Sequence, residues 1–334
     1  MRVIEAIKPG SASKSLRLVE APDPTPGPGQ LLVRPAAIGL NFIDIYRRSG
    51  LYKMSFPHVP GSEGAGEVVA AGEGSTEASG LRVGSPVAWA SSVSGSYGEL
   101  VVIAADQALP VPEGLDIAVA AALPLQGMTA DYLVRSVFPV GPEHTVAFYA
   151  AAGGVGLLAG QMIRTAGGRL LAVVGNAAKA SLLMDDGVPP ADIVTLGAMR
   201  NVTEELPKAI RACTQELGAD AVFDSIGRDT FAASLRSLRR RGTLVLFGAS
   251  SGPVAPFDPQ YLNAHGSLFL TRPSLGDYTA SRDELLERSG RVFAAAAEGR
   301  LSVRVGARFP LAEAAAAQAA LESRATTGKV LIVP

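Results

Sequence analysis

Cysteine and histidine are scarce in this 334-residue chain, which has one cysteine, Cys213, and three histidines. A single cysteine excludes an intramolecular disulfide, so nothing in the sequence indicates an oxidising compartment. The histidines show no ligand-like spacing with one another or with Cys213. We therefore expect no zinc site built on these residue types, and we predict no metal ion.

Charge is also sparse. Only 18% of the residues are charged, the formal net charge is -1, and there is no long run of one sign. The short cluster Arg239-Arg240-Arg241 is best interpreted as a solvated helix end. The composition therefore gives no support to a nucleic-acid partner or an anionic membrane surface.

Only one long segment, residues 144–163, lacks charged side chains, and it is long enough to span a bilayer. The middle of this stretch reads Gly153-Gly154-Val155-Gly156, which favours a strand, a turn and a helix instead. At the N-terminus, Glu5 and Lys8 fall where a signal peptide needs an apolar run. We expect no membrane partner and a cytoplasmic location.

The first 125 residues are rich in short apolar runs bounded by glycine and proline, such as 31–33, 67–70 and 99–103. This pattern predicts a compact, barrel-like β domain. From residue 144 onward, strand-like and helix-like segments alternate, with helices expected at 155–165, 179–184, 201–216 and 228–238. Such alternation predicts a doubly wound parallel sheet.

After about residue 270 the pattern resembles that of the first domain again, with helices expected at 282–298 and 311–322 and strands at 303–305 and 329–333. The simplest interpretation is that this segment folds back onto the N-terminal domain. We predict an α/β protein with one domain formed by 1–125 and 270–334 and a nucleotide-binding domain at 126–269.

A glycine-rich turn follows the predicted strand at 146–149 and begins a helix. Ala151, Gly153 and Gly156 have the spacing of a dinucleotide-binding turn, which needs small residues for its bend, for the pyrophosphate and for helix–strand packing. The helix N-terminus would supply free N–H groups to the phosphates.

The end of the next strand indicates which dinucleotide binds. NAD enzymes place an acidic residue there, whereas this chain has Val174-Gly175-Asn176, followed by Lys179 one helical turn later. The missing carboxylate and the nearby cation favour the 2′-phosphate of NADP. We therefore predict NADPH as the cofactor.

Six stretches carry a family resemblance: 39–46, 48–52, 150–157, 223–230, 270–274 and 322–326. Over essentially its whole length the chain resembles the zinc-free medium-chain dehydrogenases/reductases, and among them the bacterial NADPH:quinone oxidoreductases related to ζ-crystallin. The resemblance implies a GroES-like catalytic domain, a Rossmann domain and a homodimer. At the positions that hold the catalytic zinc in zinc-dependent members, this chain has Asn41, Ser62 and Gln126.

The resemblance also implies site residues. Asn41, Tyr46, Tyr52 and Gln126 are the candidate catalytic residues, and Asp44 is expected near the nicotinamide ribose. Lys179 is expected at the 2′-phosphate and Arg324 at a cofactor phosphate. The predicted cofactor-binding set is Asn41, Asp44, Tyr46, Thr129, Ala151, Gly153, Gly154, Val155, Gly156, Gly175, Asn176, Lys179, Ser225, Phe247, Gly248, Ser250, Thr271 and Arg324.

Two departures from the family pattern matter. Leu196 stands where a tyrosine often flanks the 2′-phosphate, which weakens the expected selectivity for NADPH. Gln126 replaces a lysine that close bacterial relatives often carry, which removes a cation near the substrate.

Without a metal, no Lewis acid polarises the substrate, so the acceptor must itself accept a hydride readily, as quinones and conjugated enones do. Hydrogen-bond donors would stabilise the charge that develops on the acceptor oxygen. The alternative function is reduction of enoyl thioesters or 2-alkenals by the same fold. A nucleic-acid-binding or structural, crystallin-like role is a weaker alternative, because the chain has no basic stripe.

Overall fold

The computed structural model describes all 334 residues, which divide into two compact units. Unit 1 contains Met1–Met128 and Thr279–Pro334, and unit 2 contains Thr129–Tyr278. The C-terminal segment thus belongs to the same unit as the N-terminal segment. The sequence predicts the junctions between the domains after residues 125 and 269, whereas the two units meet after Met128 and after Tyr278. No helix is long and apolar enough to cross a membrane, and residues 144–163 form a strand, a turn and a helix.

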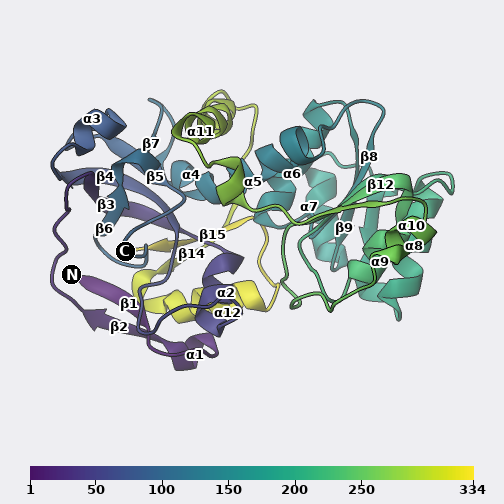
Figure 1. The fold of residues 1–334 in the computed structure, drawn as a ribbon, viewed down its shortest axis with the longest axis horizontal. Coiled ribbons are helices and arrows are strands. Elements are labelled where there is room, and N and C mark those ends of the chain that lie inside the picture. Colours follow the sequence, from purple (N-terminus) through teal and green to yellow (C-terminus); the bar gives the residue numbers. More distant parts are fainter. The chain divides into compact units, whose positions relative to one another are not determined.

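Unit 1 is built on a seven-stranded sheet with the order β14-β15-β3-β4-β5-β7, in which β6 also pairs with β3. The C-terminal strand β15 runs antiparallel to β3, so the C-terminal segment shares this sheet with strands from the first 110 residues (Figure 1). A separate hairpin joins β1 and β2. The strands are β1 (Arg2–Ala6), β2 (Leu16–Glu20), β3 (Gln30–Leu40), β4 (Glu63–Ala71), β5 (Pro86–Trp89), β6 (Val101–Ala104), β7 (Leu109–Pro110), β14 (Val305–Pro310) and β15 (Lys329–Val333).

Two hydrophobic clusters form the core of unit 1. One gathers Ile38 and Leu40 of β3 with Val330 and Ile332 of β15, and the other surrounds Trp89. Several of these strands are buried over consecutive residues, as in β6 and β15, and this continuous burial explains the short apolar runs in the sequence. The helices of this unit are α1 (Ala12–Ser15), α2 (Phe42–Ser49), α3 (Ser75–Ser79), α4 (Ile117–Ala122), α11 (Arg282–Ala297) and α12 (Ala314–Glu322), and α5 (Pro124–Tyr132) crosses the junction between the units.

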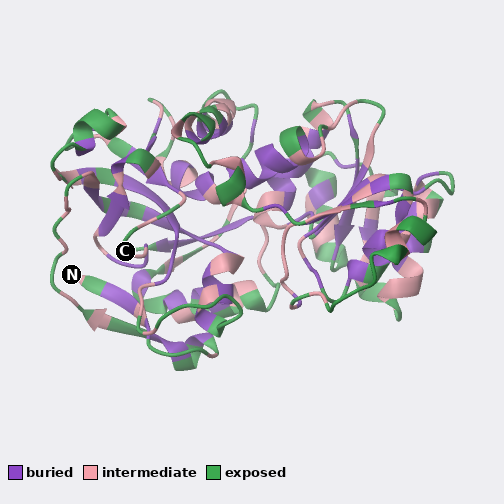
Figure 2. Ribbon diagram, viewed as in Figure 1, coloured by how far each residue is buried: buried purple, intermediate pink, exposed green.

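Unit 2 contains a six-stranded sheet with the order β10-β9-β8-β11-β12-β13. All five strand pairs are parallel, which confirms the predicted doubly wound sheet. Its central strands are almost wholly buried, as Figure 2 shows, because helices cover a sheet of this kind on both faces. The strands are β8 (Thr145–Tyr149), β9 (Arg169–Val174), β10 (Ile193–Thr195), β11 (Ala219–Asp224), β12 (Leu238–Leu246) and β13 (Phe269–Thr271).

Four helices of unit 2 fall where the sequence predicts them, within a few residues at each end: α6 (Gly154–Thr165), α7 (Ala177–Asp185), α8 (Val202–Cys213) and α9 (Phe231–Arg236). The short helix α10 (Gln260–Ala264) was not predicted. In unit 1, α11 and β15 are confirmed, whereas β14 begins only where the predicted strand 303–305 ends.

One prediction is wrong. Arg239-Arg240-Arg241 does not end a helix but lies inside β12. Helix α9 stops at Arg236, and the chain becomes extended at Leu238. Arg239 forms an ion pair with Asp220 of the neighbouring strand β11, and Arg241 adopts a left-handed backbone with φ 58° before Gly242. The cross-strand ion pair and the buried flanking leucines favour the strand over a longer helix.

Candidate active site

The carboxyl ends of all six parallel strands meet at one edge of the unit 2 sheet. In an open α/β sheet this edge is where ligands bind, next to the point at which the strand order reverses. Here the reversal lies between β8 and β11. Most predicted cofactor residues of unit 2 follow these strands: Ala151, Gly153, Gly154, Val155 and Gly156 after β8, Gly175, Asn176 and Lys179 after β9, Ser225 after β11, Phe247, Gly248 and Ser250 after β12, and Thr271 at the end of β13. Thr129 lies instead in α5 and is buried.

The turn between β8 and α6 is shaped by its glycines. Gly153 is the extended N-cap of α6, with no side chain capping the helix. A Cβ at Gly156 would lie 2.6 Å from the carbonyl oxygens of both Ala150 and Ala151, so only glycine allows this close packing of helix and turn. The N–H groups of the first helical turn have no intrahelical partner. This geometry fits the pyrophosphate of a dinucleotide.

The segment after β9 carries the predicted contact with the 2′-phosphate. The side-chain oxygen of Asn176 caps α7 by accepting a hydrogen bond from the backbone N–H of Lys179 at 3.0 Å. Lys179 is half-buried in the first turn of α7, and Gly175 and Asn176 are exposed. Leu196, after β10, packs against the hydrophobic core of unit 2. The local geometry fits a phosphate beside the first turn of α7.

Asp224 organises the loop after β11, a role that the sequence analysis did not predict. Its carboxylate accepts hydrogen bonds from the backbone N–H groups of Ile226 and Gly227 and from the hydroxyls of Thr230 and Ser234. Burial raises the pKa of this carboxyl, and those hydrogen bonds oppose the shift. An acidic residue that ends an otherwise apolar strand is the signal that could have revealed it.

The turn after β12 packs tightly on the same loop. The N–H of Ser250 donates to the carbonyl oxygen of Ser225 at 3.1 Å. A Cβ at Gly248 would lie 2.5 Å from that same oxygen, so glycine is required there as well. The ring of Phe247 lies 5.6 Å from that of Phe148 in β8, measured between centroids. These contacts fix Ser225, Gly248 and Ser250 relative to one another and hold Phe247 against β8.

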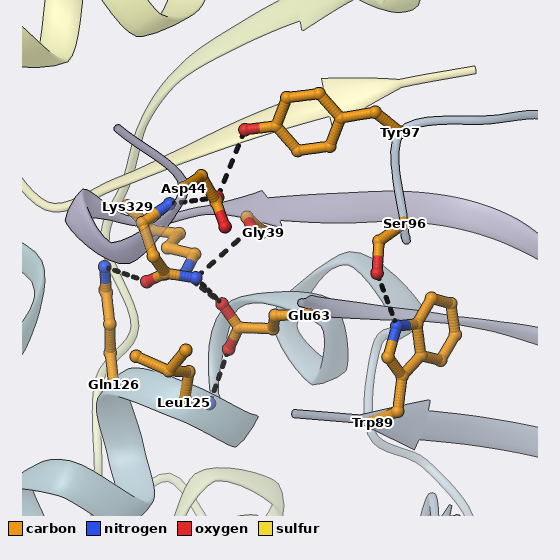
Figure 3. Close-up of polar contacts among 10 residues, drawn as sticks. Gly39, Asp44, Glu63, Trp89, Ser96, Tyr97, Leu125, Gln126 and Lys329 are labelled. Atoms are coloured by element: carbon orange, nitrogen blue, oxygen red, sulfur yellow. Dashed lines mark hydrogen bonds and ion pairs between the residues drawn. The ribbon is translucent and has the colours of Figure 1, made fainter. Parts of the chain in front are cut away.

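In unit 1, two predicted catalytic residues belong to a buried polar cluster (Figure 3). Asn41, the N-cap of α2, contacts Gln126 of α5, Glu63 of β4 and Lys329 of β15. Glu63 and Lys329 form an ion pair whose side chains are 0% and 1% exposed. Burial lowers the pKa of Lys329, and the adjacent Glu63 carboxylate opposes that shift.

Neither Glu63 nor Lys329 is a site residue predicted from the sequence. Glu63 directly follows Ser62, one of the positions matched to a zinc ligand, and Lys329 precedes an apolar strand. Tyr97, which binds Asp44 beside this cluster, was also missed. Only the pairing of β15 with β3 brings Lys329 to the start of α2.

Asp44 is fully buried rather than open to a ligand. Its Oδ2 atom accepts hydrogen bonds from the backbone N–H of Asn41 at 3.0 Å and from the Tyr97 hydroxyl at 3.1 Å. Burial raises the pKa of Asp44 to about 6, while the bond to Asn41, the charge of Arg47 and the bond to Tyr97 act in the opposite direction. In this structure Asp44 holds the beginning of α2. Its predicted place near the ribose stays a prediction.

Two tyrosines and one arginine complete the predicted set in unit 1. The rings of Tyr46 and Tyr52 lie 5.4 Å apart between centroids. Tyr46 is buried, with 9% of its surface exposed, and Tyr52 is 40% exposed. Arg324 is exposed just after α12 and has a left-handed backbone with φ 59°. Its predicted contact with a cofactor phosphate stays a prediction.

The comparisons define the class of protein. A profile described as the alcohol dehydrogenase GroES-like domain matches residues 27–113, and one described as zinc-binding dehydrogenase matches residues 191–332. Together with the parallel sheet of unit 2, these matches confirm a GroES-like domain joined to a Rossmann-type dinucleotide-binding domain.

Similar proteins narrow this class. A quinone oxidoreductase of Salmonella typhimurium is 40% identical over 323 residues, which cover 96% of this chain and 95% of that protein. The crystal structure of Escherichia coli quinone oxidoreductase in complex with NADPH is 37% identical, with a TM-score of 0.94 and full coverage of both chains. A 2-haloacrylate reductase from a Burkholderia species is 35% identical over 320 residues, covering 93% of this chain and 92% of that protein. The chain belongs to the quinone oxidoreductase family.

The residues present do not fit a zinc ion. The positions matched to zinc ligands hold two amides and a hydroxyl, whereas zinc sites use thiolate, imidazole or carboxylate ligands. The Ser62 hydroxyl accepts a hydrogen bond from Arg47 at 2.6 Å, and Asn41 and Gln126 bind one another. No group of three or more His, Cys, Asp or Glu side chains is placed to hold a metal ion.

Proposed function

We propose that the protein reduces quinones, or related conjugated enones, with NADPH by direct hydride transfer and without a metal ion. The observation that carries this proposal is the full-length similarity to a quinone oxidoreductase crystallised with NADPH. The residues at the positions matched to zinc ligands support it, because Asn41, Ser62 and Gln126 offer two amides and a hydroxyl in place of zinc ligands. NADPH supplies the hydride when it is bound.

The proposed cofactor site uses the carboxyl edge of the unit 2 sheet. The first turn of α6 would bind the pyrophosphate through its N–H groups, and Gly156 allows the chain to approach closely. Lys179 would pair with the 2′-phosphate, since no carboxylate follows β9 to bind ribose hydroxyls. Arg324, with its fork of donors, would bind another phosphate.

The residues of unit 1 would act on the acceptor. As the acceptor oxygen gains negative charge, donors aimed at it stabilise that charge. Tyr46 and Tyr52 are the candidate donors of a hydrogen bond and of the final proton, and Gln126 and Asn41 supply amide groups. Since no metal polarises the acceptor, its own conjugation must make it electrophilic.

The alternative is a reductase of 2-alkenals or enoyl thioesters. The similarity to a 2-haloacrylate reductase favours it, because a 2-haloacrylate also carries a carbon–carbon double bond conjugated to a carbonyl group. The two functions share the cofactor and the hydride step and differ in the acceptor. We further propose that the protein is a cytoplasmic homodimer, as the family resemblance implies.

The test measures NADPH and NADH oxidation by absorbance in chelator-treated protein, with phenanthrenequinone and with crotonyl-CoA as acceptors. Rapid loss of NADPH with the quinone is the expected result. Turnover with crotonyl-CoA alone would move the protein to the enoyl reductases. Loss of quinone turnover after chelation, with recovery on adding zinc, would contradict the metal-free mechanism. Size-exclusion chromatography with light scattering tests the dimer.

A further inference from the structure

The buried ion pair between Glu63 and Lys329 contacts the Asn41 amide, which in turn contacts Gln126. Lys329 begins β15 and Glu63 begins β4, and their side chains are 1% and 0% exposed. A buried ion pair is weak evidence for stability, because its desolvation offsets its attraction. The reason for keeping this pair is better sought in what it contacts.

The charges of the pair dictate how the Asn41 amide is turned. The Lys329 ammonium group can only donate, and it lies 3.0 Å from Asn41 Oδ1. The Glu63 carboxylate can only accept, and Asn41 Nδ2 donates to its Oε2 atom at 2.6 Å. Reversing the amide would place two donors together and two acceptors together. The pair therefore fixes one of the two orientations.

The fixed orientation of the Asn41 amide also fixes the orientation of the Gln126 amide. Because Asn41 Oδ1 can only accept, the Gln126 atom that lies 3.1 Å away must be its Nε2 donor. The helix carrying Gln126 is tied to the same carboxylate, since the N–H of Leu125 donates to Glu63 Oε1 at 2.7 Å (Figure 3). Glu63 thus positions Gln126 through the backbone as well as through Asn41.

The Asn41 and Gln126 amides differ in how many of their N–H protons are already used within the protein. Asn41 Nδ2 donates both to Glu63 and to the carbonyl oxygen of Gly39, at 3.2 Å, so neither of its protons is left for an acceptor. Gln126 uses one Nε2 proton toward Asn41, and its Oε1 atom is buried and has no hydrogen-bond partner. Gln126 therefore keeps one N–H for a ligand.

We propose that Lys329 and Glu63 are positioning residues: through Asn41 they orient the Gln126 amide toward the acceptor. The inference rests on the proposed function. It assigns the donor on the acceptor side to Gln126 rather than to Asn41, and it makes Asn41 the link between the ion pair and Gln126.

The test compares Lys329→Gln with Lys329→Met. Both variants remove the charge and have similar length, but only glutamine keeps a donor toward Asn41 Oδ1. In Lys329→Met, Glu63 and Gly39 still hold Asn41 Nδ2, but Oδ1 loses the donor that keeps the amide, and with it Gln126, in place. The expected result is that Lys329→Met lowers kcat/KM for the quinone by about tenfold or more, whereas Lys329→Gln stays within about threefold of the wild type. NADPH affinity, measured by fluorescence, should stay unchanged in both. Equal losses in the two folded variants, or no loss in Lys329→Met, would overturn the proposal.

The Glu63→Gln/Lys329→Met double variant covers the case in which Lys329→Met does not fold, because it leaves no unpaired buried charge. It should lose activity as Lys329→Met would. Amide NMR of the wild type gives an independent test. The Asn41 side-chain protons should exchange with solvent at least about tenfold more slowly than those of exposed Asn263. Equal exchange rates would contradict the fixed orientation.

These measurements separate the two proposals. If the wild type does not oxidise NADPH with quinones, the proposed function fails, and the exchange rates still decide how Asn41 is held. If the wild type is active and folded Lys329→Met is equally active, only the positioning role fails.

Discussion

The guanidinium group of Arg48 lies 2.6 Å from the carboxylate of Glu322 and joins α2 to α12 within unit 1. The Arg48 side chain is 0% exposed, whereas that of Glu322 is 38% exposed. Arg48 also donates to the carbonyl oxygen of Gly10 at 2.9 Å. Helix α2 begins at the Asn41 cap, so this contact secures the element that carries Asn41 and Tyr46.

We predict that Glu322→Ala lowers the free energy of unfolding by about 1–3 kcal/mol, because it leaves a buried guanidinium without its counter-charge. Denaturant titration measures the loss. Glu287→Ala, which breaks an exposed pair with Arg291 on α11, is the matched control and should change stability by less than about 0.5 kcal/mol. Equal effects of the two variants would count against a special role of the buried charge.

The stability of the protein should depend on the protonation of Asp44. The folded-state pKa is about 6 and the ordinary value is 3.8, so the folded protein takes up a proton before the unfolded chain does. This group therefore adds stability as the pH falls through 6, about 1.4 kcal/mol between roughly pH 7 and pH 5. The unfolding free energy of the wild type minus that of Asp44→Asn should therefore rise by about 1.4 kcal/mol when the pH is lowered from 7 to 5. A difference independent of pH would show that Asp44 does not titrate in this range.

Gly156→Ala should disturb the turn between β8 and α6. The added Cβ would lie 2.6 Å from two backbone oxygens, which cannot move as a flexible side chain would. We expect a loss of about 1–3 kcal/mol in stability together with weaker NADPH binding. Gly290→Ala, in α11 with open space around its Cβ position, is the control and should be neutral or stabilising. Calorimetric titration with NADPH measures the binding change.

Lys179→Ala should raise the KM for NADPH by about 10- to 100-fold and leave the KM for NADH unchanged, because only NADPH carries the 2′-phosphate. Lys208→Ala, on an exposed site of α8, is the matched control. Leu196→Tyr, which introduces the tyrosine that the family often has at this position, should increase the preference for NADPH over NADH. Parallel losses with both cofactors would place Lys179 elsewhere in the mechanism.

The two tyrosines of unit 1 should respond differently to loss of the hydroxyl group. Tyr46→Phe is expected to lower kcat for quinone reduction by about tenfold or more if the phenol donates to the acceptor oxygen. Tyr52 is the second candidate donor, but it is 40% exposed, so water can replace its hydroxyl group, and Tyr52→Phe should stay within about threefold of the wild type. Stopped-flow measurement of NADPH oxidation separates the hydride step from product release.

Much of the unit 2 fold could be predicted because its signals are local. Apolar strands, glycine turns and helical segments alternate along the chain, and the structure confirms α6, α7 and α8 within a few residues. The glycine turn after β8 and the missing acid after β9 follow from the same pattern, whereas Ser225, Phe247, Ser250 and Thr271 were expected from the family resemblance. Arg239-Arg240-Arg241 was misassigned because its strand is held by a cross-strand pair with Asp220, which no local pattern reveals.

By itself, the sequence determined the parallel sheet, the glycine turn and the lack of zinc ligands, because each depends on neighbouring residues and on composition. Only the tertiary structure decided how the polar cluster of unit 1 is assembled. Asn41, Glu63, Gln126 and Lys329 come from four separate elements, and strand pairing and helix placement bring them together. Burial then favours complementary partners for the charges of Glu63 and Lys329, and the Asn41 amide between them takes the orientation that supplies those partners.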